Sequence, residues 1–248
     1  MVFNDYVTTT QDAIIPYLKN INALGVLLVA KTQTKGRGRG SNKWCSPEGG
    51  FWATLGIKCD SIPKTRQFAL LHYSCVCFLK NLLYEKYKIK IQIKWPNDLY
   101  YNHRKLGGIL IEFFQLDNQN YLLLGMGINF NNRSTSFETP LRDQSISVSE
   151  ITQKTIGFDD FAQLIVHDII NYIYPILVNN EKFISALVDN YNKSILQKEI
   201  TLLNENQEKV KFETKGISIE GFFKIKNQNH ELNLSIDDSS KIISYIPN

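Results

Sequence analysis

The chain lacks the features that mark disulfide-rich, metal-stapled and membrane-spanning proteins. Its 248 residues include four cysteines, and neither a Cys-x-x-Cys pair nor paired histidine ligands accompany them, which argues against a zinc site or a disulfide framework. No apolar run approaches the roughly 20 residues of a transmembrane helix. The first residues also lack the charged-then-apolar layout of a signal peptide. We therefore expect a reduced, cytoplasmic protein without a membrane partner.

A strong charge of one sign is also lacking, because 28 basic and 24 acidic side chains leave a net charge of only +4. Such a balance does not by itself imply a nucleic-acid partner. The basic residues are nevertheless unevenly spread. Within residues 31–43, which contain no acid, there are five: Lys31, Lys35, Arg37, Arg39 and Lys43. This segment is the first candidate for binding an anion.

The hydrophobic content of 43% is enough for a substantial core. Apolar runs and alternation predict strands, whereas apolar residues at helical spacing predict helices. The expected strands are 25–31, 51–59, 89–95, 106–114 and 121–129, and the expected helices are 63–87, 158–178 and 180–192. Residues 133–150 are predicted to form a surface loop. The pattern favours an α+β fold.

The texture of the sequence changes after Lys193. Short β-rich runs follow one another there, separated by Asn, Gln, Gly and Asp. This pattern predicts a small all-β domain of about 55 residues. We therefore expect two domains, a larger one over residues 1–192 and a C-terminal β domain over residues 193–248.

A loop rich in glycine and arginine, Gly36-Arg37-Gly38-Arg39-Gly40, follows the first of these strands. Glycines at alternate positions leave backbone N–H groups accessible, and the arginines between them can each bind an anion through two hydrogen bonds. A phosphate is the natural partner. The alternatives are an arginine–glycine RNA-binding patch or a solvated loop. The spacing fits neither a dinucleotide-binding fingerprint nor a P-loop.

A second polar segment, residues 94–112, places an Asn-Asp pair and a double glycine between two apolar runs. Because proline and Asx residues interrupt strands, it predicts a hairpin. Its mouth would gather Lys94, Asn97, Asp98 and Lys105. In a turn, Lys105 could hold a carboxylate and a phosphate together while they react, or it could simply be exposed. Asp98 could bind Mg²⁺, fix a lysine or form an Asx-turn.

Two shorter motifs complete the set of candidate residues. Gly125-Met-Gly-Ile-Asn129 ends a strand, so Asn129 could recognise a base edge or a ribose, or merely cap the strand. The run Thr8-Thr-Thr-Gln-Asp12 predicts a helix N-terminus, whose hydroxyls could also bind a polar ligand. Gln33, just before the glycine–arginine loop, could do the same.

Taken together, these residues resemble the biotin protein ligases. The match lies in the order and spacing of four motifs within residues 5–190: Thr9-Thr-Gln11, Gln33-x-x-Gly-Arg-Gly-Arg39 with Trp44, Lys94-Trp-Pro-Asn-Asp with Arg104-Lys-Leu-Gly-Gly-Ile-Leu, and Gly125-Met-Gly-Ile-Asn129. The resemblance implies the class II aminoacyl-tRNA synthetase-like catalytic fold of biotin and lipoate ligases, a mixed sheet with helices. It also implies a small C-terminal SH3-like β-barrel.

The resemblance further implies a ligase that works in two half-reactions. Biotin and Mg²⁺-ATP would give biotinoyl-5′-adenylate and pyrophosphate, and the adenylate would then acylate one lysine of a biotin carboxyl carrier protein. Family members often pair through sheet edges, which makes a homodimer an expectation. No helix-turn-helix domain precedes residue 5, so we expect no specific DNA binding.

The site residues follow from the resemblance position by position. Those matching the biotin pocket are Thr9, Thr10, Gln11, Gln33, Gly36, Arg37, Gly38, Arg39, Lys105 and Gly108. Those matching the ATP side are Arg37, Arg39, Trp44, Lys105 and Asn129. Arg39 and Lys105 match the cations that contact the carboxylate and the α-phosphate, and hence the catalytic groups. For a metal ion, only Asp98 is a candidate.

The sequence departs from the family pattern at two of these motifs. Gln11 stands where the family more often has Asn, and Gly40-Ser-Asn-Lys43 replaces a stretch that usually carries a second phosphate-binding arginine. Lys43 is the candidate substitute for that arginine. The rival interpretations are a lipoate or octanoate ligase or transferase, which shares the fold, and a nucleic-acid-binding protein that uses the basic loop.

Overall fold

The structure is a computed structural model that describes residues 1–19 and 25–247. The chain forms two compact units, each built from two separate stretches of sequence. The first unit contains Met1–Ile62 and Arg104–Ile169, and the second contains Pro63–His103 and Ile170–Asn248. The second unit therefore groups the C-terminal strands with residues from the middle of the chain. The predicted domain boundary at residues 192 and 193 stays a prediction.

The first unit is organised around a mixed sheet. Its strands run in the order β1 (Val2–Val7), β2 (Gly25–Gln33), β3 (Phe51–Cys59), β7 (Gln119–Ile128) and β6 (Arg104–Leu116). β1 is parallel to β2, and the other neighbouring strands are antiparallel. The strands expected over 25–31, 51–59, 106–114 and 121–129 are confirmed, with small extensions. β1 was not predicted.

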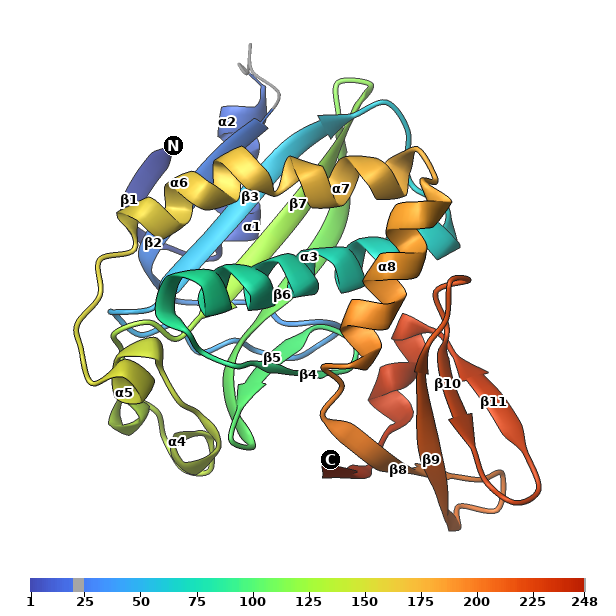
Figure 1. Cartoon of the computed structure of the whole chain (residues 1–248). Coiled ribbons are helices and arrows are strands. Elements are labelled where there is room, and N and C mark those ends of the chain that lie inside the picture. Colours follow the sequence, from blue (N-terminus) through green and yellow to red (C-terminus); the bar gives the residue numbers. More distant parts are fainter. Residues whose placement is uncertain (20–24, 248) are drawn as a thin grey trace. The chain divides into compact units, whose positions relative to one another are not determined.

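The two faces of this sheet carry different layers (Figure 1). One face is covered by the short helices α1 (Thr10–Ala13) and α2 (Ile15–Leu18), where Ile14 and Leu18 pack with Leu123 in a buried cluster. Towards the other face, Phe161 of α6 (Asp159–Asp168) lies 5.5 Å, ring centre to ring centre, from Phe51. Because side chains alternate along a strand, each face receives its own set of residues.

Residues 133–150 are more structured than expected. They contain the 3₁₀ turn η1 (Ser134–Ser136), α4 (Leu141–Gln144) and the start of α5 (Val148–Thr152). Ser147 and Glu150 form a capping box, in which Ser147 Oγ accepts from Glu150 N at 3.3 Å and Ser147 N donates to Glu150 Oε2 at 3.0 Å. The prediction of a surface loop without helices was therefore wrong for this segment. The Ser-x-x-Glu spacing of Ser147 and Glu150 is a known signal for the start of a helix.

The second unit combines helices, a hairpin and a five-stranded antiparallel sheet. The sheet has the order β11 (Glu231–Leu234), β10 (Phe223–Lys226), β9 (Lys209–Ile217), β8 (Gln197–Leu203) and β12 (Ser244–Pro247). With it come α3 (Thr65–Tyr87), β4 (Gln92–Lys94), β5 (Asp98–Tyr101), α7 (Ile170–Leu177), α8 (Glu181–Asn192) and the 3₁₀ helix η2 (Ile236–Lys241). The α+β class is confirmed, and the closed SH3-like barrel stays a prediction.

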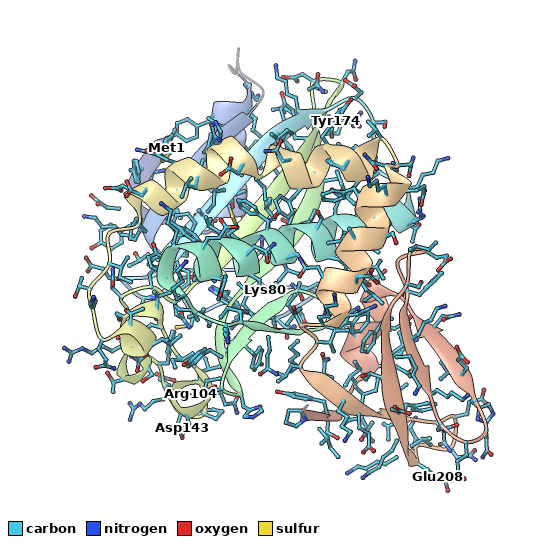
Figure 2. All side chains as sticks on the ribbon, viewed as in Figure 1. Met1, Lys80, Arg104, Asp143, Tyr174 and Glu208 are labelled. Carbon is cyan, nitrogen blue, oxygen red and sulfur yellow. The ribbon has the colours of Figure 1, made fainter. Side chains whose placement is uncertain are left out.

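Partly buried polar contacts and an aromatic stack hold the helices and the C-terminal sheet of this unit together. Lys80 of α3 donates to Asn190 Oδ1 of α8 at 2.8 Å and to Ser194 Oγ at 2.9 Å (Figure 2). Burial lowers the pKa of the Lys80 ammonium. Trp95 stacks on Phe223 of β10 with 4.6 Å between the ring centres. These contacts make one core from α3, α8 and the C-terminal strands.

Two predicted elements differ from the observed ones. The strand expected over 89–95 is only β4, because the chain turns at Trp95–Asn97 and pairs back through β5. The helix expected over 158–178 is divided into α6 and α7. Over the described parts of the chain, no single helix is long and apolar enough to cross a membrane, although the bent pair Asp159–Leu177 and Glu181–Asn192 passes that test by length and composition alone.

Candidate functional site

Glycines on β6 and β7 form the floor of the candidate site. Gly125 and Gly127 lie on the same face of β7, and Gly127 pairs with Gly108 of β6. A Cβ atom on Gly127 would lie 2.7 Å from Trp44 Nε1, and one on Gly125 would lie 3.2 Å from Gln11 Cδ. Because real Cβ atoms do not approach other atoms to 2.7 Å, only glycine at position 127 lets the Trp44 indole rest on the strand. We call Gly108, Gly125 and Gly127 the glycine floor.

Beside this floor, a set of hydrogen bonds fixes the start of α1. Gln33 Oε1 accepts from Thr10 N at 2.8 Å and from Thr10 Oγ1 at 3.1 Å, while Gln33 Nε2 donates to Ser46 Oγ at 2.7 Å. Thr54 Oγ1 of β3 donates to Thr10 Oγ1 at 2.8 Å. We call Thr10, Gln33, Ser46 and Thr54 the Gln33 clasp. The structure thus brings Gln33 together with Thr10 of the Thr9-Thr10-Gln11 motif.

The other two residues of the N-terminal motif are also buried. Thr9 is the N-cap residue of α1, but its side chain makes no capping hydrogen bond. Gln11 is 3% exposed, and its Nε2 donates to Leu110 O of β6 at 3.3 Å. Its Oε1 atom has no hydrogen-bond partner among the described residues, and the same holds for Trp44 Nε1. Each unpaired buried polar atom costs about 1–3 kcal/mol.

In the structure the glycine–arginine loop extends beyond the glycine and arginine residues and comprises residues 33–46, which fold back on themselves as a narrow hairpin. Isolated bridges join Gln33 to Ser46 and Arg37 to Lys43. Within it, Trp44 N donates to Gly36 O and Gly38 N donates to Asn42 O, both at 2.8 Å. Gly36 must lack a side chain because a Cβ there would collide with Trp44 O. The two arms of the polar loop expected from the sequence are therefore hydrogen-bonded to each other.

The two arginines of this loop occupy different environments. Arg37 Nη2 lies 3.1 Å from Asp12 Oδ1 of α1 and 3.0 Å from Glu112 Oε2 of β6. Arg39 is partly exposed near the tip, where its carbonyl accepts from Asn42 N at 3.3 Å. Lys43 is exposed. Arg37 thus contacts α1 and β6, whereas Arg39 lies at the tip of the hairpin and Lys43 lies on the arm opposite Arg37.

Lys105 is the second residue of β6. The sequence had predicted a turn at this position, and that prediction was wrong. The turn falls earlier, at Asn102 and His103, which both have left-handed φ values of 45° and 63°. The Lys105 ammonium lies 4.8 Å from the centroid of the Trp44 ring, within cation–π distance. Two residues assigned to the ATP side by resemblance are therefore brought together.

The Asn129 side chain is buried and fixes the backbone around Lys105. Its Nδ2 donates to Lys105 O at 3.4 Å and to Ile146 O at 3.2 Å, and its Oδ1 accepts from Asn132 Nδ2 at 3.1 Å. This places Asn129 beside Lys105 in a supporting position, with direct contact to adenine still a prediction. Asn132 was missed. Its buried Oδ1 has no hydrogen-bond partner within the described chain, and the run Asn129-Phe-Asn-Asn132 was its only signal.

The Lys94-Trp-Pro-Asn-Asp motif belongs to the second unit. Lys94 of β4 pairs with Asp98 of β5. The Lys94 ammonium lies 4.6 Å from the ring centroid of Tyr245 and 5.7 Å from that of Tyr100. Burial and the Asp98 carboxylate raise the pKa of Tyr100. A shared mouth for Lys94, Asp98 and Lys105 stays a prediction.

A metal site made by the protein alone does not stand out. Within residues 1–19 and 25–247, no group of three or more His, Cys, Asp or Glu side chains is arranged to hold a metal ion. Mg²⁺ usually keeps several waters and binds through one or two carboxylates plus the phosphates of a substrate. Asp98 therefore remains the candidate carboxylate, in a role that depends on a bound nucleotide.

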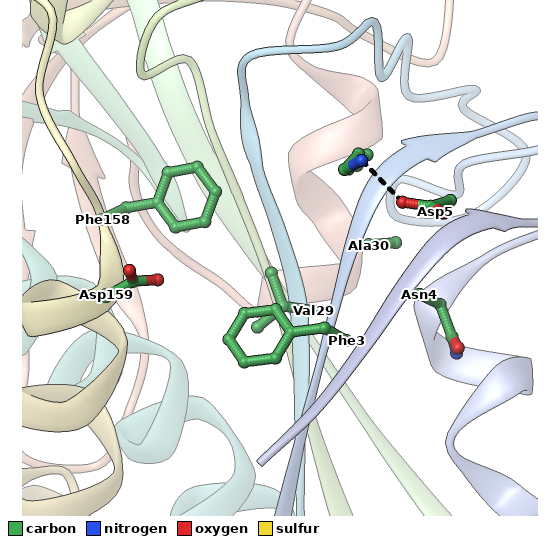
Figure 3. A pocket seen from close by; sticks show the side chains of 8 residues that line it. Phe3, Asn4, Asp5, Val29, Ala30, Phe158 and Asp159 are labelled. Atoms are coloured by element: carbon green, nitrogen blue, oxygen red, sulfur yellow. Dashed lines mark ion pairs between the residues drawn. The ribbon is translucent and has the colours of Figure 1, made fainter.

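A cavity of about 290 Å³ lies elsewhere in the first unit, between β1, β2 and the start of α6 (Figure 3). Phe3, Val29 and Phe158 line its apolar part. At its rim, Lys31 Nζ and Asp5 Oδ1 form an exposed ion pair at 2.7 Å. None of the predicted site residues lines this cavity. The candidate site is therefore defined by its glycine floor and its polar groups, and this cavity is separate from it.

Comparison with known proteins agrees with this arrangement. Residues 7–129 match the model of the biotin/lipoate A/B protein ligase family. The chain is 35% identical over 170 residues to the bifunctional ligase/repressor BirA of Bacillus subtilis, which covers 67% of this chain and 50% of that protein. It is 35% identical over 117 residues to the human biotin–protein ligase, covering 44% of this chain and 16% of that one. The chain spans half or less of the length of these relatives.

A solved structure matches over a much larger share. The biotin protein ligase from Aquifex aeolicus in complex with biotin and ATP has a TM-score of 0.75 and 26% identity, covering 100% of this chain and 98% of that one. The ligase from Leishmania major with biotinyl-5-AMP shares the fold, with a TM-score of 0.57 and 21% identity over 94% of this chain and 98% of that one. The expected catalytic fold is confirmed. Motifs, sequence matches and fold together identify the chain as a relative of the biotin protein ligases.

Proposed function

We propose that the chain is a biotin protein ligase, which joins biotin to a lysine of a biotin carboxyl carrier protein through a biotinoyl-5′-adenylate. One observation carries the proposal. On the glycine floor lie an unpaired buried acceptor, Gln11 Oε1, and an unpaired buried donor, Trp44 Nε1, and the Trp44 ring also bears the Lys105 ammonium. This is a polar recognition site joined to a cation.

The head group of biotin suits such a site. Its ureido ring offers N–H donors, so it can supply the donor that Gln11 Oε1 lacks. A lipoyl or octanoyl chain has no such donor and would leave Gln11 Oε1 unpaired. Sites built to hydrogen-bond a substrate reject analogues that lack the matching group, because the buried polar atoms then stay unsatisfied. This argument favours biotin over the lipoate alternative.

The activation step needs two anions within bonding distance. A carboxylate oxygen of biotin attacks the α-phosphorus of ATP, and the bond to pyrophosphate breaks. Lys105 supplies a cation that lowers the repulsion between carboxylate and α-phosphate, and Arg39 can add a second one from the tip of the loop. Mg²⁺, bound with the phosphates, would neutralise the leaving pyrophosphate. Hydrogen bonds from Asn129 Nδ2 and from Ile146 N to Lys105 O hold the Lys105 backbone in position.

The transfer step requires the adenylate to be kept from water. The ε-amine of the acceptor lysine attacks the acyl carbon, AMP leaves with the bonding electrons, and the amine loses its proton. An exposed acyl-adenylate would hydrolyse instead. The glycine–arginine loop, which already packs Trp44 on the floor, is the element suited to exclude water. We further propose a cytoplasmic protein that pairs as a homodimer through a sheet edge.

Mass spectrometry tests the proposed reaction directly. The full chain, incubated with biotin, ATP and MgCl₂, should form biotinoyl-5′-AMP, and adding a purified biotin carrier domain should convert the adenylate into biotinylated carrier. Parallel reactions without biotin, and with lipoate in its place, are the controls. Formation of lipoyl-adenylate but no biotinoyl-adenylate would overturn the biotin assignment. Salt-dependent RNA retention without any adenylate would favour the nucleic-acid-binding alternative.

A further inference from the structure

Arg37 connects three segments that are distant in sequence. Its Nη2 atom lies 3.1 Å from Asp12 Oδ1 and 3.0 Å from Glu112 Oε2. Asp12 belongs to α1, Arg37 to the glycine–arginine loop and Glu112 to β6. A single guanidinium therefore ties the loop to a helix and to the sheet at the same time.

The two carboxylates stand beside the candidate pocket. Asp12 directly follows Gln11, and Glu112 lies two residues beyond Leu110, whose carbonyl accepts the Gln11 amide. Because side chains alternate along a strand, Gly108, Leu110 and Glu112 share one face of β6. Arg37 therefore lies at one edge of the site, beside Glu112. Gly108 lies four positions earlier on the same face of β6.

The charge balance favours a holding role for Arg37. Its guanidinium faces two carboxylates, so an incoming phosphate would have to compete with both for it. We propose that Arg37, Asp12 and Glu112 form a latch that holds the glycine–arginine loop over the glycine floor. Asp12 and Glu112 are then positioning residues for the loop. The consequence for the reaction intermediate rests on the proposed function, whereas the latch itself does not.

A latch of this kind can open readily. The side chains are 43% exposed for Arg37, 54% for Asp12 and 35% for Glu112. Exposed ion pairs are individually weak and are screened by salt. The Gln33 clasp at the base of the same loop consists of hydrogen bonds with buried partners, which salt affects much less. Raising the ionic strength should therefore weaken the ion pairs that hold the loop at Arg37. The hydrogen bonds at the base of the loop, around Gln33, should stay in place.

Limited trypsin digestion of the ligand-free full chain tests the latch without any catalysis. Cleavage after Arg39 and Lys43, quantified by mass spectrometry, should become faster by about 2–5-fold in Asp12→Asn and in Glu112→Gln, and by more in the double variant. Glu213→Gln is the matched control, because it removes an exposed ion pair with Lys215 in the second unit. It should leave cleavage of the loop unchanged.

A salt titration of the wild-type chain gives a second, independent test. Loop cleavage, normalised to trypsin activity on an unstructured peptide, should rise between low salt and about 0.5 M NaCl, and the double variant should lose most of that dependence. Unchanged cleavage in a folded double variant, or wild-type cleavage that does not respond to salt, would overturn the latch. The titration decides the matter even if the double variant does not fold.

Activity measurements separate the latch from the proposed function. In Glu112→Gln, an adenylate that escapes should label lysines of a bystander protein about 2–5-fold more than in the wild type. If no variant and no wild-type sample forms adenylate, the proposed function fails while the cleavage results still judge the latch. If adenylate forms normally but loop cleavage and bystander labelling are unchanged, the latch fails alone.

Discussion

The base and the outer part of the glycine–arginine loop are held by different forces. At its base, the Gln33 clasp consists of hydrogen bonds of 2.7–3.1 Å, with Thr10, Ser46 and Thr54 all buried. Farther along, Arg37 is held by two ion pairs whose side chains are substantially exposed. The contacts at the base are therefore shielded from water, whereas those of Arg37 are open to it.

This difference allows the base of the loop to recognise the substrate while the outer part controls entry to the site. A pocket that must recognise a small polar head needs fixed partners, and buried hydrogen bonds supply them. A cover that must admit substrates and release product needs contacts that break at low cost, and exposed ion pairs supply those. One loop can therefore carry both properties if its base is rigid and its outer part is reversible. The predictions below test this division, from the largest expected effect to the smallest.

Replacing Lys105 should have the largest effect, because this lysine supplies the fixed cation of the proposed activation step. Its backbone is fixed by Asn129, and its ammonium lies over Trp44 of the loop. Lys105→Ala should lower biotin-dependent adenylate formation by at least about 100-fold, since the fixed cation is lost. Lys35→Ala, which removes an exposed charge from the same loop, is the control. Near-normal rates in Lys105→Ala would remove its catalytic role.

Breaking the base of the loop should come next. Gln33→Ala leaves Thr10 N and Oγ1 without their acceptor and should lower the free energy of unfolding by about 1–3 kcal/mol. The KM for biotin should rise about tenfold, because the start of α1 loses its support. Urea denaturation and steady-state kinetics measure the two effects, with the exposed Gln144→Ala as control. A change in stability without a change in KM would place the clasp outside the biotin pocket.

Filling the floor should displace the loop and spare the clasp. In Gly127→Ala the new Cβ would lie 2.7 Å from Trp44 Nε1, so the indole must move away. We expect about a fivefold loss of adenylate formation and changed tryptophan fluorescence. Gly157→Ala is a matched control, because a Cβ there meets no atom within 4 Å. Equal behaviour of the two variants would show that the packing of Trp44 on the floor is not used.

The smallest effect on turnover should come from the loop tip. Arg39→Gly removes a cation that is held near the tip and should let more adenylate escape. Labelling of a bystander protein should rise about 3–5-fold. The affinity for biotin, which we expect to depend on Gln33, should stay unchanged. Mass spectrometry of lysine modification on the bystander gives the readout. Reduced biotin affinity with unchanged bystander labelling would assign Arg39 to the recognition region instead.

The sequence predicted the elements with long apolar patterns. The strands around residues 25–31 and 51–59, the helix near 63–87 and the hairpin of β6 and β7 all bury several consecutive or regularly spaced apolar side chains. β1 was not predictable in this way, because Val2-Phe-Asn-Asp-Tyr-Val7 is half exposed and depends on pairing with β2. Short helices such as α5 depend on capping instead of apolar periodicity.

The candidate site was predictable in its residue types but not in their partners. Motif spacing singled out Gln33, Trp44 and Lys105, and the structure brings the latter two within 4.8 Å. The contacts of Arg37 had no sequence signal, since its partners lie 25 positions before it and 75 after it. Ion pairs between distant surface residues leave no periodic pattern. Whether a loop arginine binds a ligand or the protein itself is decided by tertiary structure.

Pyrophosphate exchange with different acids tests the central claim most directly. The full chain is given ATP, MgCl₂ and labelled pyrophosphate with biotin, lipoate or octanoate as the only acyl substrate, and incorporation of label into ATP is measured. The account predicts exchange with biotin and only background exchange with the other two, because they have no N–H donor for Gln11 Oε1. Exchange with lipoate or octanoate in the absence of exchange with biotin would contradict it.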